Sequence, residues 1–269
     1  MPSDKRARQR AGTLARREAL AQRQKRRRQV RSSITVAIVA VVVVGSVFLI
    51  TRHHNSSNTP TLPPGEQGKL DAIAIKAGCP SSPKTRVNTL SFKAPPPLTI
   101  SSTATYTATV KTDVGSFVVA LDTKDYPVAA NNFVFLARHK FYNCVIFHRV
   151  VKNFIDQGGD PTGTGTGGPG YEFTAPAPPP ATPQYPLGAV VYANSDNPGS
   201  ANPKSNGSQF FIVTGPEGES LPAYYAPFGQ VTSGMSVVQK INQAGSAATS
   251  QAGTPTLYHR VLSVTIKES

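Results

Sequence analysis

The chain has 269 residues and a net charge of +14, with 24 prolines, 22 glycines and two cysteines. This length accommodates one large domain or two small ones. The charge is uneven: residues 1–31 carry twelve Lys/Arg against two acidic residues, whereas residues 104–269 carry ten of each sign. The basic charge therefore belongs to a tail, and the remainder lacks the excess of cations typical of nucleic-acid-binding domains.

An apolar segment, residues 32–51, follows the basic tail. A helix of this length is about 30 Å long and matches the hydrocarbon core of a bilayer. A cleaved signal peptide is disfavoured because the apolar run exceeds its usual ~7–15 residues and Arg52, His53 and His54 follow where small residues are needed. We predict a single-pass transmembrane helix, with residues 1–31 cytoplasmic and the rest of the chain exported. Anionic lipid is the expected partner of the tail. Binding of the tail to nucleic acid is the alternative, and we do not expect it.

Residues 52–102 contain the proline-rich runs TPTLPPG, CPSSP and APPP and show little hydrophobic periodicity. This composition predicts a semi-extended extracytoplasmic spacer without a core of its own. The apolar residues Leu90 and Phe92 allow part of it to dock on the domain that follows, which we expect to occupy residues 103–269.

Short β-strands dominate the predicted domain. Alternation of apolar and polar residues indicates strands at 105–112 and 116–122, and further strands are expected at 144–151, 188–192, 209–214, 228–231 and 260–267. Helices are predicted at 127–140, which begins with a proline, and at 235–242. Many short strands with two helices favour a closed or nearly closed antiparallel β-barrel over a parallel α/β sheet.

A lone arginine, Arg149, lies in an apolar run just before a glycine-rich loop. The loop segment Gly163–Gly168 matches G-x-G-x-x-G, but phosphate binding needs a helix to begin there, and Pro169 with the later prolines prevents one. The histidines and cysteines form no metal-spaced motif, and no nucleophile elbow is present. We therefore expect no metal, no cofactor and no covalent catalysis, which leaves Arg149 as the candidate working group.

Four segments resemble, in order and spacing, the signature of the cyclophilins, a family of peptidyl-prolyl cis/trans isomerases. The segments are FHRVVKNFIDQGGDPTGTGTGGPG (147–170), YAN (192–194), NGSQFFI (206–212) and FGQV (228–231). The resemblance runs from about residue 105 to residue 266. It implies a mainly β fold, an eight-stranded antiparallel β-barrel capped by two helices, and proline-containing polypeptides as substrates.

The resemblance also implies the site residues. The expected catalytic residues are Arg149, Gln157 and Phe154, with Gln157 holding the arginine. The expected substrate-binding residues are Ile155, Tyr192, Ala193, Asn194, Gln209, Phe211, Leu221 and Tyr225. Tyr225 stands where many members of the family have histidine, so that a hydroxyl group would replace the imidazole as a hydrogen-bond donor.

The chemistry of prolyl isomerisation explains how an arginine in an apolar run can act as a catalytic group. Amide resonance sets a barrier of about 18–20 kcal/mol, and the twisted state has a localised lone pair on the prolyl nitrogen. A guanidinium group that binds the twisted amide better than the planar one lowers this barrier. We therefore predict a membrane-anchored isomerase for exported proteins. The alternative is a proline-binding module or holdase chaperone on the same fold.

Two cysteines, Cys79 and Cys144, lie in the part of the chain expected to be exported, where disulfides persist. Cys144 occupies a turn position that is commonly glycine in the family. A bond from this turn to Cys79 would attach the spacer to the barrel. We predict this disulfide, with two unrelated thiols as the alternative.

Overall fold

The computed structural model describes residues 65–179, 181, 184–195, 204–247 and 253–269. The predicted basic tail and transmembrane helix lie outside these residues, and both stay predictions. Within the described ranges, no helix is long and apolar enough to cross a bilayer.

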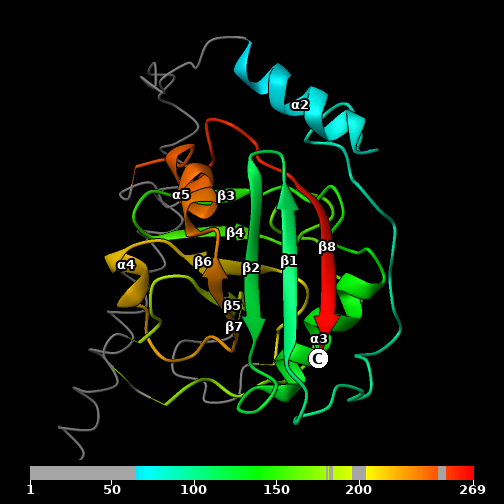
Figure 1. Ribbon diagram of the computed structural model, residues 1–269, viewed down its shortest axis with the longest axis vertical. Coiled ribbons are helices and arrows are strands. Elements are labelled where there is room, and N and C mark those ends of the chain that lie inside the picture. Colours follow the sequence, from blue (N-terminus) through cyan, green and yellow to red (C-terminus); the bar gives the residue numbers. More distant parts are fainter. Residues whose placement is uncertain (1–64, 180, 182–183, 196–203, 248–252) are drawn as a thin grey trace, which may run out of the picture. The chain divides into compact units, whose positions relative to one another are not determined.

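The described strands form one antiparallel sheet of eight strands in the order β3-β4-β6-β5-β7-β2-β1-β8 (Figure 1). The strands are β1 (Tyr106–Thr112), β2 (Gly115–Leu121), β3 (Arg149–Val151), β4 (Ile155–Gly158), β5 (Ala189–Tyr192), β6 (Phe210–Val213), β7 (Pro227–Ser233) and β8 (Val261–Glu268). The helices are α2 (Glu66–Lys76), α3 (Pro127–Arg138), α4 (Pro216–Glu219) and α5 (Met235–Gln243). The predicted mainly β, antiparallel architecture is confirmed.

Backbone contacts join the two ends of this sheet. Ile146, just before β3, forms an antiparallel bridge with Arg260, just before β8. The N–H of Cys144 donates to the carbonyl of Val261 at 2.7 Å, and the N–H of Val261 donates to the carbonyl of Val145 at 2.8 Å. The curled sheet is therefore nearly closed, as a barrel requires.

The first strand shows why the sequence forms a sheet with one buried face. Tyr106, Ala108 and Val110 are buried in the main core, whereas Thr109 and Lys111 are exposed. Apolar and polar residues alternate in this way because successive side chains of a strand point to opposite faces. α3 contributes Phe133 to an aromatic part of the same core, and α5 packs near β2, β3 and β4.

One predicted strand boundary was wrong, and one strand was not predicted. The strand expected at 144–151 begins only at Arg149, because Cys144 has a φ of 66° and lies in a turn. This left-handed conformation favours glycine, in keeping with the residue expected at that turn. Strand β4 was missed, since two of its four residues, IDQG, are Asp and Gly, which are uncommon in strands.

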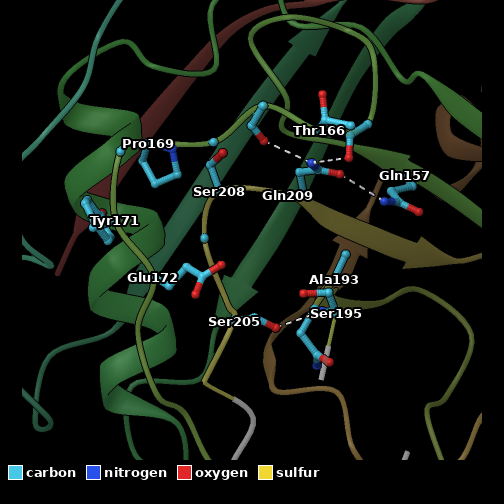
Figure 2. A pocket seen from close by; sticks show the side chains of 16 residues that line it. Gln157, Thr166, Pro169, Tyr171, Glu172, Ala193, Ser195, Ser205, Ser208 and Gln209 are labelled. Carbon is cyan, nitrogen blue, oxygen red and sulfur yellow. Dashed lines mark hydrogen bonds between the residues drawn. The ribbon is translucent and has the colours of Figure 1, made fainter. Parts of the chain in front are cut away.

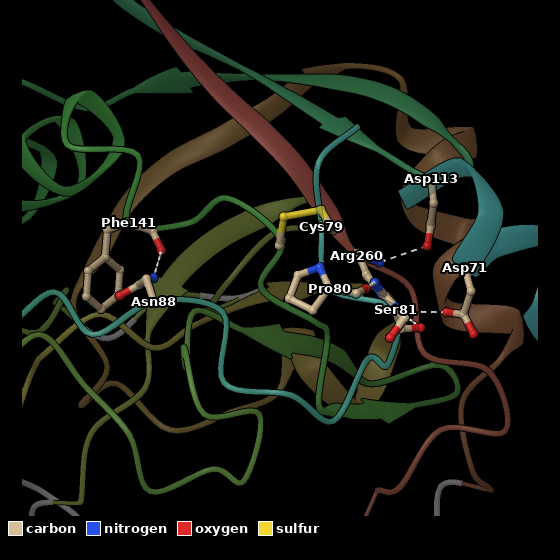
Figure 3. The surroundings of a disulfide bond; sticks show 9 residues. Asp71, Cys79, Pro80, Ser81, Asn88, Asp113, Phe141 and Arg260 are labelled. Carbon is tan, nitrogen blue, oxygen red and sulfur yellow. Dashed lines mark hydrogen bonds and ion pairs between the residues drawn. A yellow bond between two sulfur atoms is a disulfide. The ribbon is translucent and has the colours of Figure 1, made fainter. Parts of the chain in front are cut away.

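Helix α2 was also missed, and it lies within the predicted spacer. Only Leu70 and Ala74 of this helix are buried, while Ile73 and Ile75 are exposed, so the helix has a weak apolar face. After α2, residues 77–100, here called the strap, continue to the barrel. Cys79 of the strap is bonded to Cys144, with an S–S distance of 2.08 Å (Figure 3).

A buried arginine makes the N-terminal segment part of the fold. Arg260 is only 1% exposed, and its guanidinium forms an ion pair with Asp71 of α2 at 2.6 Å (Figure 3). The same guanidinium donates to the carbonyl of Pro80 in the strap. Removing one partner of a buried ion pair commonly costs about 3–5 kcal/mol. The barrel therefore depends on α2 and the strap to satisfy this charge.

Candidate active site

Three predicted site residues lie side by side across the sheet. Arg149 begins β3 and is paired with Gln157 of β4, and Gln157 is paired with Phe211 of β6. Residues paired across antiparallel strands point to the same face. This face is the outer one, because the neighbours Val150 and Phe210 point into the main core.

An apolar cluster, here called the outer cluster, covers this face and is separate from the main core. Its buried members are Ile155, Tyr185, Ala189, Val191, Phe211 and Val213, and the partly buried Phe154, Ala193, Leu221 and Tyr225 pack against them. The Phe211 and Tyr225 rings meet edge to face, with centroids 5.4 Å apart. The cluster can hold a small apolar ring such as that of proline beside aromatic walls.

The guanidinium of Arg149 lies at the border of the outer cluster. Its Cζ atom is 5.6 Å from the centre of the Phe154 ring, a cation–π distance. The side chain is half-buried, and burial lowers the pKa of Arg149 from its usual 12.5, opposed by nearby Tyr225. An arginine remains charged in proteins, so this border combines a cation with a partly dry surface.

Gly253 packs against the side chain of Arg149, a contact that the sequence did not predict. Its carbonyl accepts a hydrogen bond from the N–H of Val150 at 2.7 Å. A Cβ atom on Gly253 would lie 2.5 Å from Cγ of Arg149, and the residue has a φ of +61°. Only glycine fits here without moving the arginine. A single glycine in AGT (252–254) gives no signal of this role.

A polar cleft of about 810 Å³ lies beside the outer cluster (Figure 2). Four predicted site residues line it: Gln157, Ala193, Asn194 and Gln209. Ala193 belongs to both the cleft and the outer cluster, so the two regions adjoin. The opposite wall is formed by residues 165–170 of the glycine-rich loop, which extends from residue 160 to residue 170.

Gln209 connects the two walls of the cleft. Its Nε2 donates to the carbonyls of Gly165 and Gly167, both at 2.9 Å, and its Oε1 accepts a hydrogen bond from Nε2 of Gln157 at 3.1 Å (Figure 2). On the sheet side, Nδ2 of Asn194 donates to the carbonyl of Tyr224 at 3.0 Å. These bonds orient the amide groups before any ligand arrives.

The glycine-rich loop surrounds the carboxylate of one of its own residues, Asp160. The carboxylate of Asp160, 1% exposed, accepts hydrogen bonds from the N–H groups of Thr162, Thr164, Gly165 and Gly167 at 2.6–3.1 Å. The loop therefore directs these N–H groups at its own aspartate, which explains the glycines without a phosphate. Burial alone would raise the pKa of Asp160, but the hydrogen bonds from Thr162 and the glycines outweigh it and lower the pKa.

We expect the stability contributed by Asp160 to disappear in acid. Because its pKa is lower in the folded state, this stability is complete above the unfolded pKa of about 4 and is lost as the pH falls through the folded value. Asp160→Asn should lower the free energy of unfolding at neutral pH by about 1.5–3 kcal/mol, and the loss should shrink as the pH falls below the unfolded value. Urea unfolding across this range measures both. Asp125→Asn, at an exposed carboxylate, is the control; a deficit for Asp160→Asn that stays constant with pH would contradict the assignment.

The family model for the cyclophilin type peptidyl-prolyl cis-trans isomerases matches residues 107–266. The chain belongs to this enzyme family. The match covers the whole sheet apart from the outermost residues of β1 and β8. It includes Arg149, the outer cluster and the polar cleft.

Relatives support the same membership. A peptidyl-prolyl cis-trans isomerase of Arabidopsis thaliana is 38% identical over 150 residues, 55% of this chain and 85% of the relative. One of Helicobacter pylori is 40% identical over 140 residues, 51% of this chain and 80% of the relative. The crystal structure of a Cryptosporidium parvum cyclophilin is 28% identical and aligns with a TM-score of 0.52, covering 61% of this chain and 99% of that one. Another structure of that cyclophilin was determined in the presence of the dipeptide Ala-Pro.

Tyr192 is the predicted site residue whose side chain lies elsewhere in this cyclophilin. It is 0% exposed and packs in the main core, where its hydroxyl accepts a hydrogen bond from Nδ2 of Asn132 at 2.8 Å. Strand alternation points Val191 and Ala193 outward and Tyr192 inward. The Tyr192 side chain therefore lies in the core, and the part of this residue in substrate binding stays a prediction.

Two further residues support the site and were missed. The Tyr185 hydroxyl donates to the carbonyl of Tyr225 at 2.9 Å and accepts from its N–H at 3.0 Å, which fixes Tyr225 beside Phe211. Burial raises the pKa of Tyr225, as does nearby Tyr224, while Arg149 lowers it, so its hydroxyl is a donor at neutral pH. Asn242 of α5 donates to the carbonyl of Val151 at 3.0 Å and holds the end of β3.

Proposed function

We propose that this cyclophilin is a membrane-anchored prolyl isomerase for exported proteins and that Arg149 stabilises the twisted prolyl amide. The observation that carries the proposal is the row formed by Arg149, Gln157 and Phe211 on three neighbouring strands. It places a half-buried cation beside the apolar outer cluster, while Gln157 of the same row lines the cleft with its amide groups.

The proposed reaction uses these regions together. The proline ring packs on the outer cluster against Phe211, while amide groups at the cleft hold the substrate backbone, so that one side of the prolyl bond turns against the other. As the bond twists, the prolyl nitrogen becomes pyramidal and Arg149 donates a hydrogen bond to it. Because the planar amide offers no such lone pair, this bond favours the twisted state.

Tyr225 has a proposed role as a second donor. Its protonated hydroxyl lies in the segment that Tyr185 fixes, and its ring packs on Phe211. We propose that this hydroxyl donates to a substrate carbonyl near the proline ring. Bonds to the flanking backbone restrain the substrate and leave the rotating amide to Arg149.

The substrate class is supported by the chemistry of the site and by the relative determined with Ala-Pro. The alternative, a proline-binding holdase, predicts binding without turnover. The refolding of an unrelated protein that is limited by prolyl isomerisation separates the two. We expect acceleration when the full chain is present at a small fraction of the refolding protein's concentration. If acceleration required as much of this chain as of the refolding protein, the holdase would be favoured.

The proposed location is supported by the sequence: twelve cations precede the apolar segment 32–51. Positive charge near one end of a membrane helix keeps that end cytoplasmic, and the cations of the tail attract anionic lipid. The disulfide between Cys79 and Cys144 suits an oxidising compartment.

A reporter fusion tests this topology. An export-dependent reporter joined after Ser269 should be active, and the same reporter joined after Arg31 should be inactive. A reporter that works only in the cytoplasm should give the opposite pattern. Cytoplasmic activity of the fusion after Ser269 would disprove both the anchor and the location.

A further inference from the structure

The strap contacts the glycine-rich loop from behind, at both ends of the loop. The N–H of Val87 donates to the carbonyl of Pro161 at 2.9 Å, and the N–H of Phe92 donates to the carbonyl of Pro169 at 2.8 Å. Between these points the loop carries the carbonyls of Gly165 and Gly167 that hold Gln209. The strap is therefore bonded to the outer side of a wall whose inner side lines the polar cleft.

The packing between strap and loop is close. A Cβ atom on Gly170 would lie 2.2 Å from Oγ of Ser91 and 3.0 Å from the carbonyl oxygen of Phe92. Gly170 also has a φ of +91°, so glycine is required here both by conformation and by space. The loop and the strap thus fit together without room for a side chain.

The ring of Phe92 extends this contact to the cleft. It packs edge to face against Phe135 of α3, with centroids 4.8 Å apart, and against Tyr171, with centroids 6.4 Å apart. Tyr171 lines the cleft (Figure 2). Its hydroxyl donates to Oδ1 of Asn132 at 2.6 Å. One strap side chain therefore supports a residue of the cleft wall.

The strap is itself held to the barrel on either side of Val87. Cys79 is bonded to Cys144, and Nδ2 of Asn88 donates to the carbonyl of Phe141 at 2.8 Å (Figure 3). Both barrel partners belong to the segment between α3 and β3. Because these attachments do not involve the glycine-rich loop, the strap can serve as a fixed support for it.

We propose that residues 87–92 of the strap are a positioning segment that sets the affinity of the isomerase for long peptides. The segment holds the glycine-rich wall, and the wall fixes Gln209 and the width of the polar cleft. A peptide long enough to extend from the outer cluster into the cleft contacts the wall that the strap holds. A short Xaa–Pro peptide binds the outer cluster alone and does not reach this wall. The proposal rests on the proposed function of the outer cluster and the cleft.

The test compares three variants. Two of them weaken the contact between the strap and the glycine-rich loop, and the third weakens the packing of α2 on the barrel. Phe92→Ala removes the ring contacts, and Val87→Pro removes the N–H that reaches Pro161. The matched control is Leu70→Ala, because Leu70 packs with Ala244 and Leu257, away from the loop. All three are made in the full chain, and thermal unfolding is recorded for each.

The measurement is kcat/KM for a four-residue and a ten-residue peptide with the same central Xaa–Pro bond. We expect Phe92→Ala and Val87→Pro to raise KM for the long peptide on the order of three- to tenfold with kcat nearly unchanged. The short peptide should be unaffected, and Leu70→Ala should leave the long-to-short ratio at its wild-type value. Faster amide hydrogen exchange at Gly165 and Gly167 should accompany the change in KM.

Reduction of the disulfide in the unchanged chain provides a second measurement if either variant fails to fold. Reduction should shift the long-to-short ratio in the same direction. An unchanged ratio in the strap variants and after reduction would overturn the proposal, as would an equal shift in Leu70→Ala. Failure of the wild-type chain to turn over the short peptide would instead refute the proposed function of the site.

Discussion

Arg149→Ala is expected to reduce kcat/KM for prolyl isomerisation by about 10²- to 10³-fold, the usual effect of removing one donor that acts in the transition state. Peptide binding should change little, because the outer cluster that receives the proline ring remains intact. The loss should therefore appear mainly in kcat. Arg149→Lys should recover only part of the activity, since an ammonium group cannot match the planar fork of a guanidinium.

The assay for this prediction is the isomerisation rate of a short Xaa–Pro peptide together with its dissociation constant. Arg138→Ala is a matched control, because Arg138 is an exposed arginine of α3 that pairs with Glu268. Phe211→Ala should show the opposite pattern to Arg149→Ala, with weaker peptide binding, because the proline ring loses its apolar wall. Wild-type turnover by Arg149→Ala would refute the role given to the arginine.

Loss of the disulfide is expected to cause a large loss of stability. The bond joins residues 65 positions apart, and the loop-entropy model gives a stabilisation of about 4 kcal/mol for a loop of this length. The bond also holds the strap, whose Pro80 carbonyl accepts a hydrogen bond from the buried Arg260. The double variant Cys79→Ser/Cys144→Ser should therefore unfold at a much lower urea concentration than the oxidised protein.

Serine is a suitable replacement because it keeps a Cβ atom at position 144, where φ is 66°. The backbone conformation is then equally unfavourable in both proteins, and the comparison reports the bond alone. Reductant should destabilise the wild-type chain and leave the double variant unchanged. Equal unfolding midpoints for oxidised wild type and double variant would show that the bond contributes nothing.

The parts of the fold that follow from sequence are those with a regular pattern. The alternation around Tyr106 and Val110 predicts β1, and the proline that opens α3 marks its first turn. α2 gives no such signal, because Leu70 and Ala74 are its only buried residues. Its place in the fold is set instead by Asp71, whose partner Arg260 is 189 residues away in the chain.

The order of the motifs predicted which residues belong to the candidate site. It did not predict in which direction each side chain points. Arg149, Gln157 and Phe211 fall on one row of the sheet, as an active groove requires. Tyr192 belongs to the same motifs, yet strand alternation turns it into the core. Gly253 was missed because its role depends on a close approach to Arg149 across about 100 residues of chain, which no local pattern indicates.

The most direct test of the central claim is the exchange rate between cis and trans forms of a bound proline peptide, measured by NMR at saturation. With every protein molecule occupied, differences in affinity no longer contribute, and the rate reports the rotation step itself. We predict rapid exchange on the wild-type full chain and exchange slowed by about 10²- to 10³-fold on Arg149→Ala with the peptide still bound. Equally rapid exchange on both proteins would show that the arginine does not drive the rotation.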